Sequence, residues 1–195
     1  MGDGADAALD YIEDCWEYQN LHQPEPGDDM YDPLAGWWGD EEKTKGMIIE
    51  ADMMPSVDEG YLTDLAWIVP LDRMCFRHCA WGRRHFRQEL ARRGVRLAVV
   101  RRRAYILYRK WGSKFEVIGI AVHPRYRHRG IGRMLIQHVI DQALPVEGSR
   151  IFLEVNCANE AAIHLYEKLG FVVIGRLKGY YGRSEHAFEM MREMD

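Results

Sequence analysis

The stretch Val122-His-Pro-Arg-Tyr-Arg-His-Arg-Gly-Ile-Gly-Arg133 decides the fold, because it joins an apolar run ending at Val122 to a helical pattern beginning at Gly130. The first N–H groups of a helix have no partner inside the helix, and the helix dipole adds partial positive charge at that end. Glycine at positions 130 and 132 lets the backbone approach a ligand with no Cβ in the way. The loop therefore predicts an anion site that suits a pyrophosphate, with added charge from Arg127, Arg129 and Arg133.

The segments on either side of this loop predict an alternating order of strands and helices. The residues expected in strands are 95–100, 104–108, 115–122, 150–155, 171–174 and 187–191, and those expected in helices are 64–76, 84–93, 130–143 and 159–169. This order predicts an α/β (α+β) domain with a mixed, mostly antiparallel central sheet flanked by helices. A Rossmann dinucleotide site would need G-x-G-x-x-G and an acid about twenty residues later, and neither is present.

The formal net charge of −4 hides an uneven distribution along the 195 residues. Residues 1–60 carry 17 Asp and Glu against two Lys, a balance of −15, whereas the rest of the chain has a balance of +11. A basic body suits a polyanionic ligand, and nucleic acid would satisfy the same charge, so charge alone leaves both open.

The hydrophobic content of 47% is typical of soluble globular proteins. With no signal-peptide pattern and no long apolar stretch, we expect a cytoplasmic protein without membrane contact.

Residues 1–56 are predicted to form an acidic extension that is partly disordered, because they contain many acids, several prolines including Pro24, Pro26 and Pro33, and no sustained apolar period. Two interpretations stay open for this segment. It folds back over the basic body and competes with an anionic ligand, or it serves as a solubilising or partner-binding tail. Residues 57–195 are predicted to form the folded domain.

The cysteines raise the question of a metal. Cys75, Cys79 and His85 supply ligand types that zinc accepts, but their segment resembles a continuous helix and lacks a second paired-cysteine motif. Packed or surface helix residues are therefore the preferred interpretation, and no metal is expected. Without an export signal, the four cysteines are expected to be reduced thiols.

Two blocks of sequence resemble one known family. Arg127-x-x-Gly130-x-Gly132 is similar to the Q/R-x-x-G-x-G/A signature of GNAT acetyltransferases, and Asn159 to Phe171 resembles that family's N-x-x-A-x-x-L-Y-x-x-x-G-F block. The resemblance covers about residues 63–191 and implies the GNAT fold with acetyl-CoA as cosubstrate. It implies that acetyl-CoA is held by the strand end, the loop and the next helices, at Ile120, Ala121, Val122, Arg127, His128, Arg129, Gly130, Ile131, Gly132, Arg133 and Asn159. The backbone of residues 120–122 would bond the amides of the pantetheine arm like an added strand.

Within that family the chain is most similar to RimI-type enzymes, the ribosomal-protein-alanine N-acetyltransferases. Residues 116–124 resemble their E-I-L-N-I-A-V-H-P strand, and Leu153-Glu-Val matches their L-E-V strand. This resemblance implies that the acceptor is the N-terminal α-amine of a protein, such as a ribosomal protein. The chain departs from the pattern at Gly119, where Asn is usual, in the short hairpin at 99–104, and in the acidic extension.

The same comparison supplies candidate catalytic residues. Alternation along 151–156 places Glu154 on the opposite face from its apolar neighbours, beside an aromatic residue, where partial desolvation would raise its basicity. Glu154 is the expected general base, against the alternative of a structural or solvated carboxylate. Tyr166 is expected, by resemblance, to protonate the departing thiolate, against the alternative of a core tyrosine. Tyr180 and Tyr181 are expected in a loop that orients the peptide, against ordinary edge packing. Asn159 is also predicted to cap its helix.

Three alternatives to a protein N-terminus as acceptor follow from the same residues. The acceptor amine could belong to lysine, a polyamine or an aminoglycoside, and the positive balance of the body argues against a polyamine. The chain could also be a non-catalytic acetyl-CoA-binding module, which would not need both Glu154 and Tyr166. Nucleic-acid binding through the basic face is the least favoured, since the arginines gather at the glycine motif.

Overall fold

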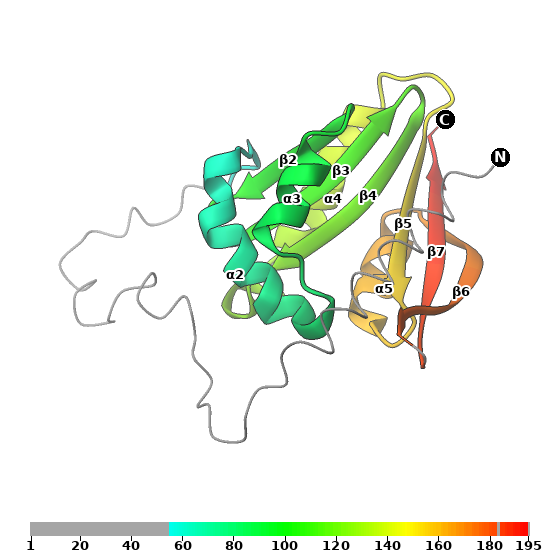
Figure 1. The fold of residues 1–195 in the computed structure, drawn as a ribbon. Coiled ribbons are helices and arrows are strands. Elements are labelled where there is room, and N and C mark those ends of the chain that lie inside the picture. The colour runs from blue at the N-terminus through cyan, green and yellow to red at the C-terminus, as the bar shows by residue number, and fades with distance from the viewer. Residues whose placement is uncertain (1–54, 183, 195) are drawn as a thin grey trace.

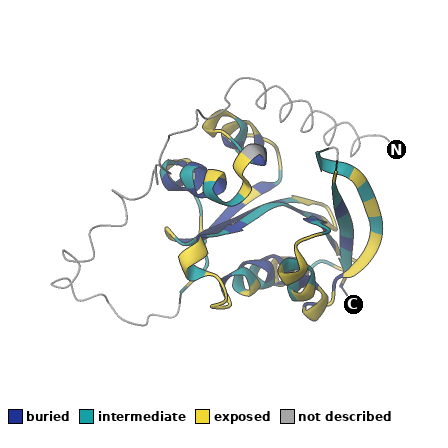
Figure 2. Ribbon diagram, turned by 90° about the horizontal axis from the view of Figure 1, so that it is seen from below, coloured by how far each residue is buried: buried dark blue, intermediate teal, exposed yellow. Residues whose placement is uncertain are grey.

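The computed structural model describes residues 55–182 and 184–194, which form one seven-stranded sheet with helices on both faces (Figures 1 and 2). The predicted extension lies almost entirely outside the described residues. The strands are β1 (Asp58–Glu59), β2 (Val95–Val100), β3 (Ala104–Trp111), β4 (Lys114–Val122), β5 (Arg150–Asn156), β6 (Val172–Gly182) and β7 (Glu185–Glu193). The helices are α2 (Leu65–Phe76), α3 (Arg83–Leu90), α4 (Ile131–Ala143) and α5 (Glu160–Lys168), with 3-10 turns η1 (Leu62–Asp64), η2 (Arg77–Cys79) and η3 (Pro124–Tyr126). The order of elements and the mixed sheet confirm the predicted fold class.

The sheet has the order β1-β2-β3-β4-β5-β7-β6, and β4 with β5 is its parallel pair. That pair is short, since it joins residues 114–117 of β4 to residues 150–153 of β5. On the other side of β4, Leu107 lies opposite Gly119 and Tyr108 lies opposite Val117, which leaves Ile118 as an extra residue. An extra residue bends a strand and increases its local twist. Accordingly, β4 and β5 diverge beyond Val117, as Figure 1 shows.

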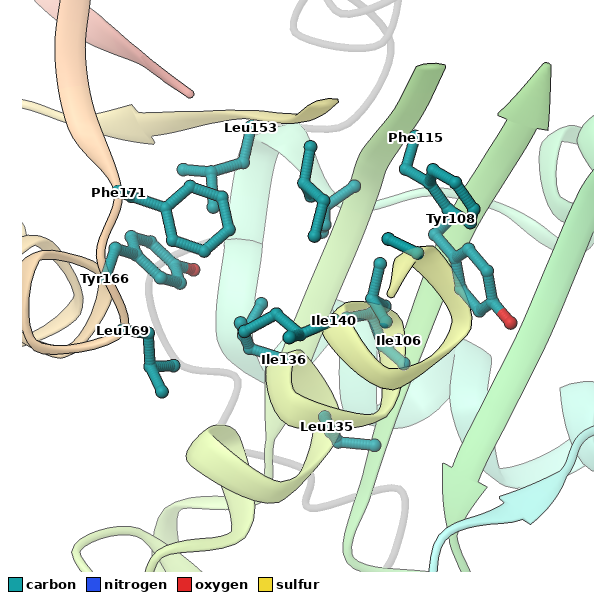
Figure 3. Packing of buried hydrophobic residues seen from close by; sticks show 14 of the residues in the cluster. Ile106, Tyr108, Phe115, Leu135, Ile136, Ile140, Leu153, Tyr166, Leu169 and Phe171 are labelled. Atoms are coloured by element: carbon teal, nitrogen blue, oxygen red, sulfur yellow. The ribbon is translucent and has the colours of Figure 1, made fainter. Parts of the chain in front are cut away.

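Two apolar clusters hold the layers together, one on each face of the sheet. Helices α4 and α5 pack on one face around residues such as Leu135, Ile136 and Phe171, which are at most 2% exposed (Figure 3). Helices α2 and α3 pack on the other face around Leu65, Ile68 and Phe86. This second cluster draws its sheet residues from β2, β3 and β4, and none of its described members comes from β5 or β7.

Three local predictions differ from the structure. Tyr180 and Tyr181 lie within β6 rather than in a loop, because this strand runs to Gly182. The sequence pattern did not indicate a strand here, because glycine at position 179 is typical of a turn. In the structure Gly179 has φ 70°, and the pairing of β6 with β7 is irregular after Leu177. The segment containing Cys75 and Cys79 is not one helix, because Arg77 takes a φ of 49° between α2 and η2. The helix predicted at 84–93 ends at Leu90, and a turn leads to Gly94 at φ 83°. Across the described residues, no helix combines the length and apolar character needed to span a membrane.

Candidate active site

A cavity of about 500 Å³ occupies the gap where β4 and β5 diverge. One wall comes from Val117 to Ile120 of β4 and the opposite wall from Leu153 to Asn156 of β5. Further lining residues come from α2, the segment before α3, α3, β3, the turn before α5, α5 itself, β6 and β7. Because residues 118–122 of β4 are not paired with β5, their backbone faces this gap as a sheet edge does. The bulge at Ile118 therefore creates the site.

Glu154 projects from β5 toward this cavity. Its neighbours Leu153 and Val155 are buried in the α4–α5 cluster, so Glu154 lies on the opposite face, as the alternation predicts. Burial, together with the negative charges of Glu116 and Glu189, raises the pKa of Glu154 to about 7. Glu189 is its cross-strand partner on β7. The carboxylate can therefore take up a proton near neutral pH.

Tyr166 reaches the cavity from α5 on the other side of the sheet. Its ring packs 5.9 Å from that of Phe171, and the residue is 5% exposed (Figure 3). Among the described residues its hydroxyl has no hydrogen-bond partner. Burial raises its pKa to about 12, so the hydroxyl keeps its proton throughout the physiological range. A buried hydroxyl without a partner is costly unless a ligand bonds to it.

The two tyrosines of β6 differ in their relation to the cavity, because Tyr181 lines it and Tyr180 does not. The hydroxyl of Tyr181 donates to the backbone carbonyl of Glu154 at 3.5 Å, and burial raises the pKa of this phenol. The ring of Tyr180 lies edge-on to Tyr181 at 4.8 Å, but Tyr180 is not part of the cavity lining. Of the two residues expected to orient a peptide, the structure thus brings only Tyr181 into the cavity.

Asn159 caps helix α5, as predicted. Its Oδ1 accepts from the backbone N–H of Ala162 at 3.2 Å. The residue also lines the cavity, next to Asn156 and Ala158. A capping role and a ligand contact are therefore compatible, because the second lone pair of the amide oxygen and the amide nitrogen stay available.

The arginine and glycine loop follows the end of β4, outside the cavity lining. Gly130 is the N-cap of α4 with φ 78°, and no side chain caps that helix. A Cβ at Gly130 would meet no atom of the described residues within 4 Å, so none of these residues covers the loop at this position. His128 also has positive φ, at 60°. The first N–H groups of α4 are therefore presented to an external anion.

The arginines of the loop have different surroundings. Arg127 donates from Nε to the carbonyl of Val122 at 3.1 Å, and its Nη2 lies 3.5 Å from the Sγ of Cys75. Arg129 lies over the ring of Tyr126 at 5.6 Å. Arg133 lines a separate hollow of about 340 Å³, so it is not gathered with the other two. Ala121 and Ile131 are 4% and 3% exposed, which leaves only their backbone groups for a ligand.

Sequence reasoning missed Asp72 and Tyr105, two polar residues that line the cavity from α2 and β3. Asp72 is 2% exposed and Tyr105 is also 2% exposed. A signal was present, because Asp72 occurs four residues after Ile68 and seven after Leu65, on the apolar face of the predicted helix. Within residues 55–182 and 184–194, no group of three or more His, Cys, Asp and Glu side chains is arranged to hold a metal ion.

Comparison with known proteins agrees with this geometry. Residues 69–171, more than half of the chain, match the acetyltransferase (GNAT) family, and the chain belongs to that family. It is 34% identical over 91 residues to a streptothricin acetyltransferase of Streptomyces lavendulae, covering 45% of this chain and 48% of that protein. It is 40% identical over 81 residues to the N-alpha-acetyltransferase RimI of Mycobacterium tuberculosis, covering 41% of this chain and 49% of that one. The chain thus spans about half the length of the curated relatives it matches.

A solved structure extends the likeness beyond these segments. The ribosomal-protein-S18-alanine N-acetyltransferase of Escherichia coli superposes with a TM-score of 0.64 at 25% identity. The match covers 72% of this chain and 94% of that one. The expected family and its RimI-type relatives are therefore confirmed.

Proposed function

We propose that this protein transfers the acetyl group of acetyl-CoA to the N-terminal α-amine of a protein. The observation that carries the proposal is the forked sheet, in which a strand edge on β4 faces Glu154 on β5 across one cavity. The family membership and the RimI-type relatives support acetyl transfer, and the relatives named for ribosomal protein acetylation support a protein N-terminus as acceptor.

The fit of acetyl-CoA rests on two features of the chain. The uncapped start of α4, with none of the described residues over Gly130, suits the diphosphate, and Arg127 and Arg129 add positive charge. The backbone of Ile120 to Val122, which is not paired with β5, suits the amides of the pantetheine arm. Further contacts with acetyl-CoA are proposed from family likeness alone, at His128, Ile131, Gly132, Arg133 and Asn159. When bound, acetyl-CoA supplies an activated acetyl thioester.

Glu154 is proposed as the general base. An α-ammonium group has a pKa near 8, so a carboxylate with a pKa of about 7 is well matched to accept its proton. The exposed side of β5 beside Glu154 is lined by Asn156, which donates to Glu185 at 3.2 Å. Glu154, Asn156 and Glu185 all line the cavity, so its β5–β7 side is polar and suits an amine.

Tyr166 is proposed as the general acid. Its hydroxyl is buried, protonated and without a partner among the described residues, so it can give its proton to a departing thiolate. The proposed base and acid lie on opposite faces of the sheet, and both Glu154 and Tyr166 line the cavity between β4 and β5. Such a placement suits a reaction in which one proton is taken from the amine and another is given to sulfur.

Tyr181 is proposed to orient the first residue of the acceptor, with Tyr180 supporting its ring. The decisive experiment incubates the full-length protein with acetyl-CoA and peptides that differ in their first residue, beside lysine-containing peptides with blocked N-termini and a polyamine. Mass spectrometry of the products should find acetyl groups on free N-termini. Modification confined to the blocked peptides or to the polyamine would refute the proposed acceptor.

The cosubstrate assignment has its own test. Gly130→Asn adds a side chain over the loop while keeping a residue that tolerates positive φ. We expect acetyl-CoA, measured by calorimetric titration, to bind at least tenfold more weakly. Unchanged affinity in this variant would contradict the proposed diphosphate site.

A further inference from the structure

A buried carboxylate on the acceptor side of the cavity has no part in the mechanism above. Asp72 lies on α2, is 2% exposed and lines the cavity. Its carboxylate accepts from the backbone N–H of Trp81 and from the hydroxyl of Tyr105. Among the described residues no Lys, Arg or His forms an ion pair with it, and burial raises its pKa to about 6.

The two donors join three separate elements at one point. Asp72 belongs to α2, Trp81 lies in the segment between η2 and α3, and Tyr105 belongs to β3. A Cβ built on Gly119 would lie 3.8 Å from the hydroxyl of Tyr105, so this hydroxyl lies against β4 just beyond the bulge. Asp72 therefore links the segment at Trp81 to the strand that forms one wall of the cavity.

The segment fixed by this carboxylate lines the cavity through Cys79 and Trp81. The Trp81 ring stacks on His85 with centroids 4.1 Å apart and lies edge-on to Phe86 at 5.3 Å. Two residues earlier, the thiol of Cys79 donates to the backbone carbonyl of Tyr181 at 3.7 Å. A chain of contacts thus runs from Asp72 through this segment to β6, across the open end of the fork.

We infer that Asp72 is a positioning residue that holds the segment from Cys79 to Trp81 in place as the acceptor-side wall. This inference rests on the proposed function, since it assigns that wall to acceptor binding. A carboxylate suits this position because it accepts two hydrogen bonds at once and donates none, and charge-assisted bonds are stronger than neutral ones. Asp72 itself does not touch the reacting atoms in this account.

The variants Asp72→Ala, Asp72→Asn and Tyr105→Phe test the inference in the full-length protein. Asp72→Ala should raise the KM for a peptide acceptor at least tenfold, with kcat and the Kd of acetyl-CoA within about threefold of the parent. Asp72→Asn keeps an amide oxygen that can accept from Trp81, so it should recover most of the KM. Tyr105→Phe removes one of the two donors and should give an intermediate KM.

Asp64→Ala is the matched control. Asp64 is also a buried carboxylate at the start of α2 that takes two donors, Tyr61 N–H at 2.8 Å and the Trp67 indole at 3.1 Å, but it does not line the cavity. Its loss should lower stability and leave the acceptor KM unchanged. Equal effects of Asp64→Ala and Asp72→Ala on KM would overturn the inference, as would a larger effect on acetyl-CoA affinity than on KM.

Hydrogen exchange provides a readout that does not depend on the acceptor. In Asp72→Ala, the Trp81 amide should exchange at least tenfold faster, as measured by mass spectrometry of peptides covering 77–86. If Asp72→Ala does not fold, Asp72→Asn and Tyr105→Phe decide by the same measurements. If no peptide is acetylated, the proposed function fails. The exchange rate still tests whether Asp72 holds the segment at Trp81, because an unchanged exchange rate of the Trp81 amide would exclude that role.

Discussion

Replacement of Glu154 by Gln should remove the pH dependence of turnover near neutrality. With a pKa of about 7, about half of the Glu154 side chains are ionised at pH 7, and about one tenth at pH 6. If the carboxylate is the base, kcat at saturating peptide should rise about fivefold from pH 6 to pH 7 and less than about twofold from pH 7 to pH 8. Glu154→Gln should lower kcat by about 10² to 10⁴ and remove this inflection.

The assay measures acetylated peptide by mass spectrometry between pH 5.5 and 9, with both substrates saturating so that ionisation of the free amine does not enter. Glu193→Gln is the control, because Glu193 lies on β7 on the same face of the sheet, half-exposed and paired with Arg150 at 2.9 Å. Its profile should match that of the parent protein. A Glu154→Gln enzyme that keeps the inflection, with kcat within about threefold of the parent, would refute the base assignment.

Stability should change in the same variant with a defined sign. The folded-state pKa of Glu154 is raised from 4.5 to about 7, so its ionised form destabilises the folded protein. This penalty is absent below pH 4.5, grows between pH 4.5 and 7, and is complete above pH 7. Glu154→Gln should therefore unfold at higher urea than the parent at pH 8, by about 1–3 kcal/mol, with the difference shrinking at pH 5. A variant less stable than the parent at pH 8 would contradict the raised pKa.

Three further substitutions test neighbouring parts of the site. Glu189→Gln removes a negative charge opposite Glu154 and should move the inflection in kcat to lower pH, by about 0.5 to 1 unit; an upward move would be inconsistent with this cause. Tyr166→Phe should lower kcat about 10²-fold or more with acetyl-CoA affinity unchanged, and equal turnover would exclude its role as acid. Because its hydroxyl has no hydrogen-bond partner within residues 55–182 and 184–194, the same variant should keep its Tm or raise it slightly in a thermal melt. Gly130→Ala should cost about 1 kcal/mol in urea unfolding, since φ there is 78°, and no cost would argue against that conformation.

Much of this architecture could be predicted because it depends on local patterns. Helical spacing after Gly130 placed α4 correctly, and alternation along β5 placed Glu154 on the face away from the apolar core. Asn159 was predicted as a cap from its position alone, and the bond to the Ala162 amide bears this out. Such features follow from backbone geometry over a few residues, so the sequence around each of them is sufficient.

The features that could not be predicted depend on pairing between distant segments. The bulge at Ile118 appears only in the register of β3 against β4. The adjacent Gly119 is compatible with a bulge, but glycine alone does not fix its position or its effect on pairing. The length of β6, and with it the placement of Tyr180, is set by pairing with β7. Asp72 meets Tyr105 across 33 positions of sequence. Its place on an apolar helix face indicates burial, but only the tertiary structure shows which donors it meets.

The short pairing between β4 and β5 separates two parts of the sheet that have different proposed roles. Within the sheet, four residue pairs join the strands that lead to the arginine and glycine loop to the strands that carry Glu154, Tyr181 and the β6–β7 hairpin. Side chains at the acceptor end can therefore change without altering the strands that lead to the glycine loop. Under the proposed function, substitutions in the β6–β7 hairpin would change which amine is accepted, while the loop proposed to bind acetyl-CoA stays the same.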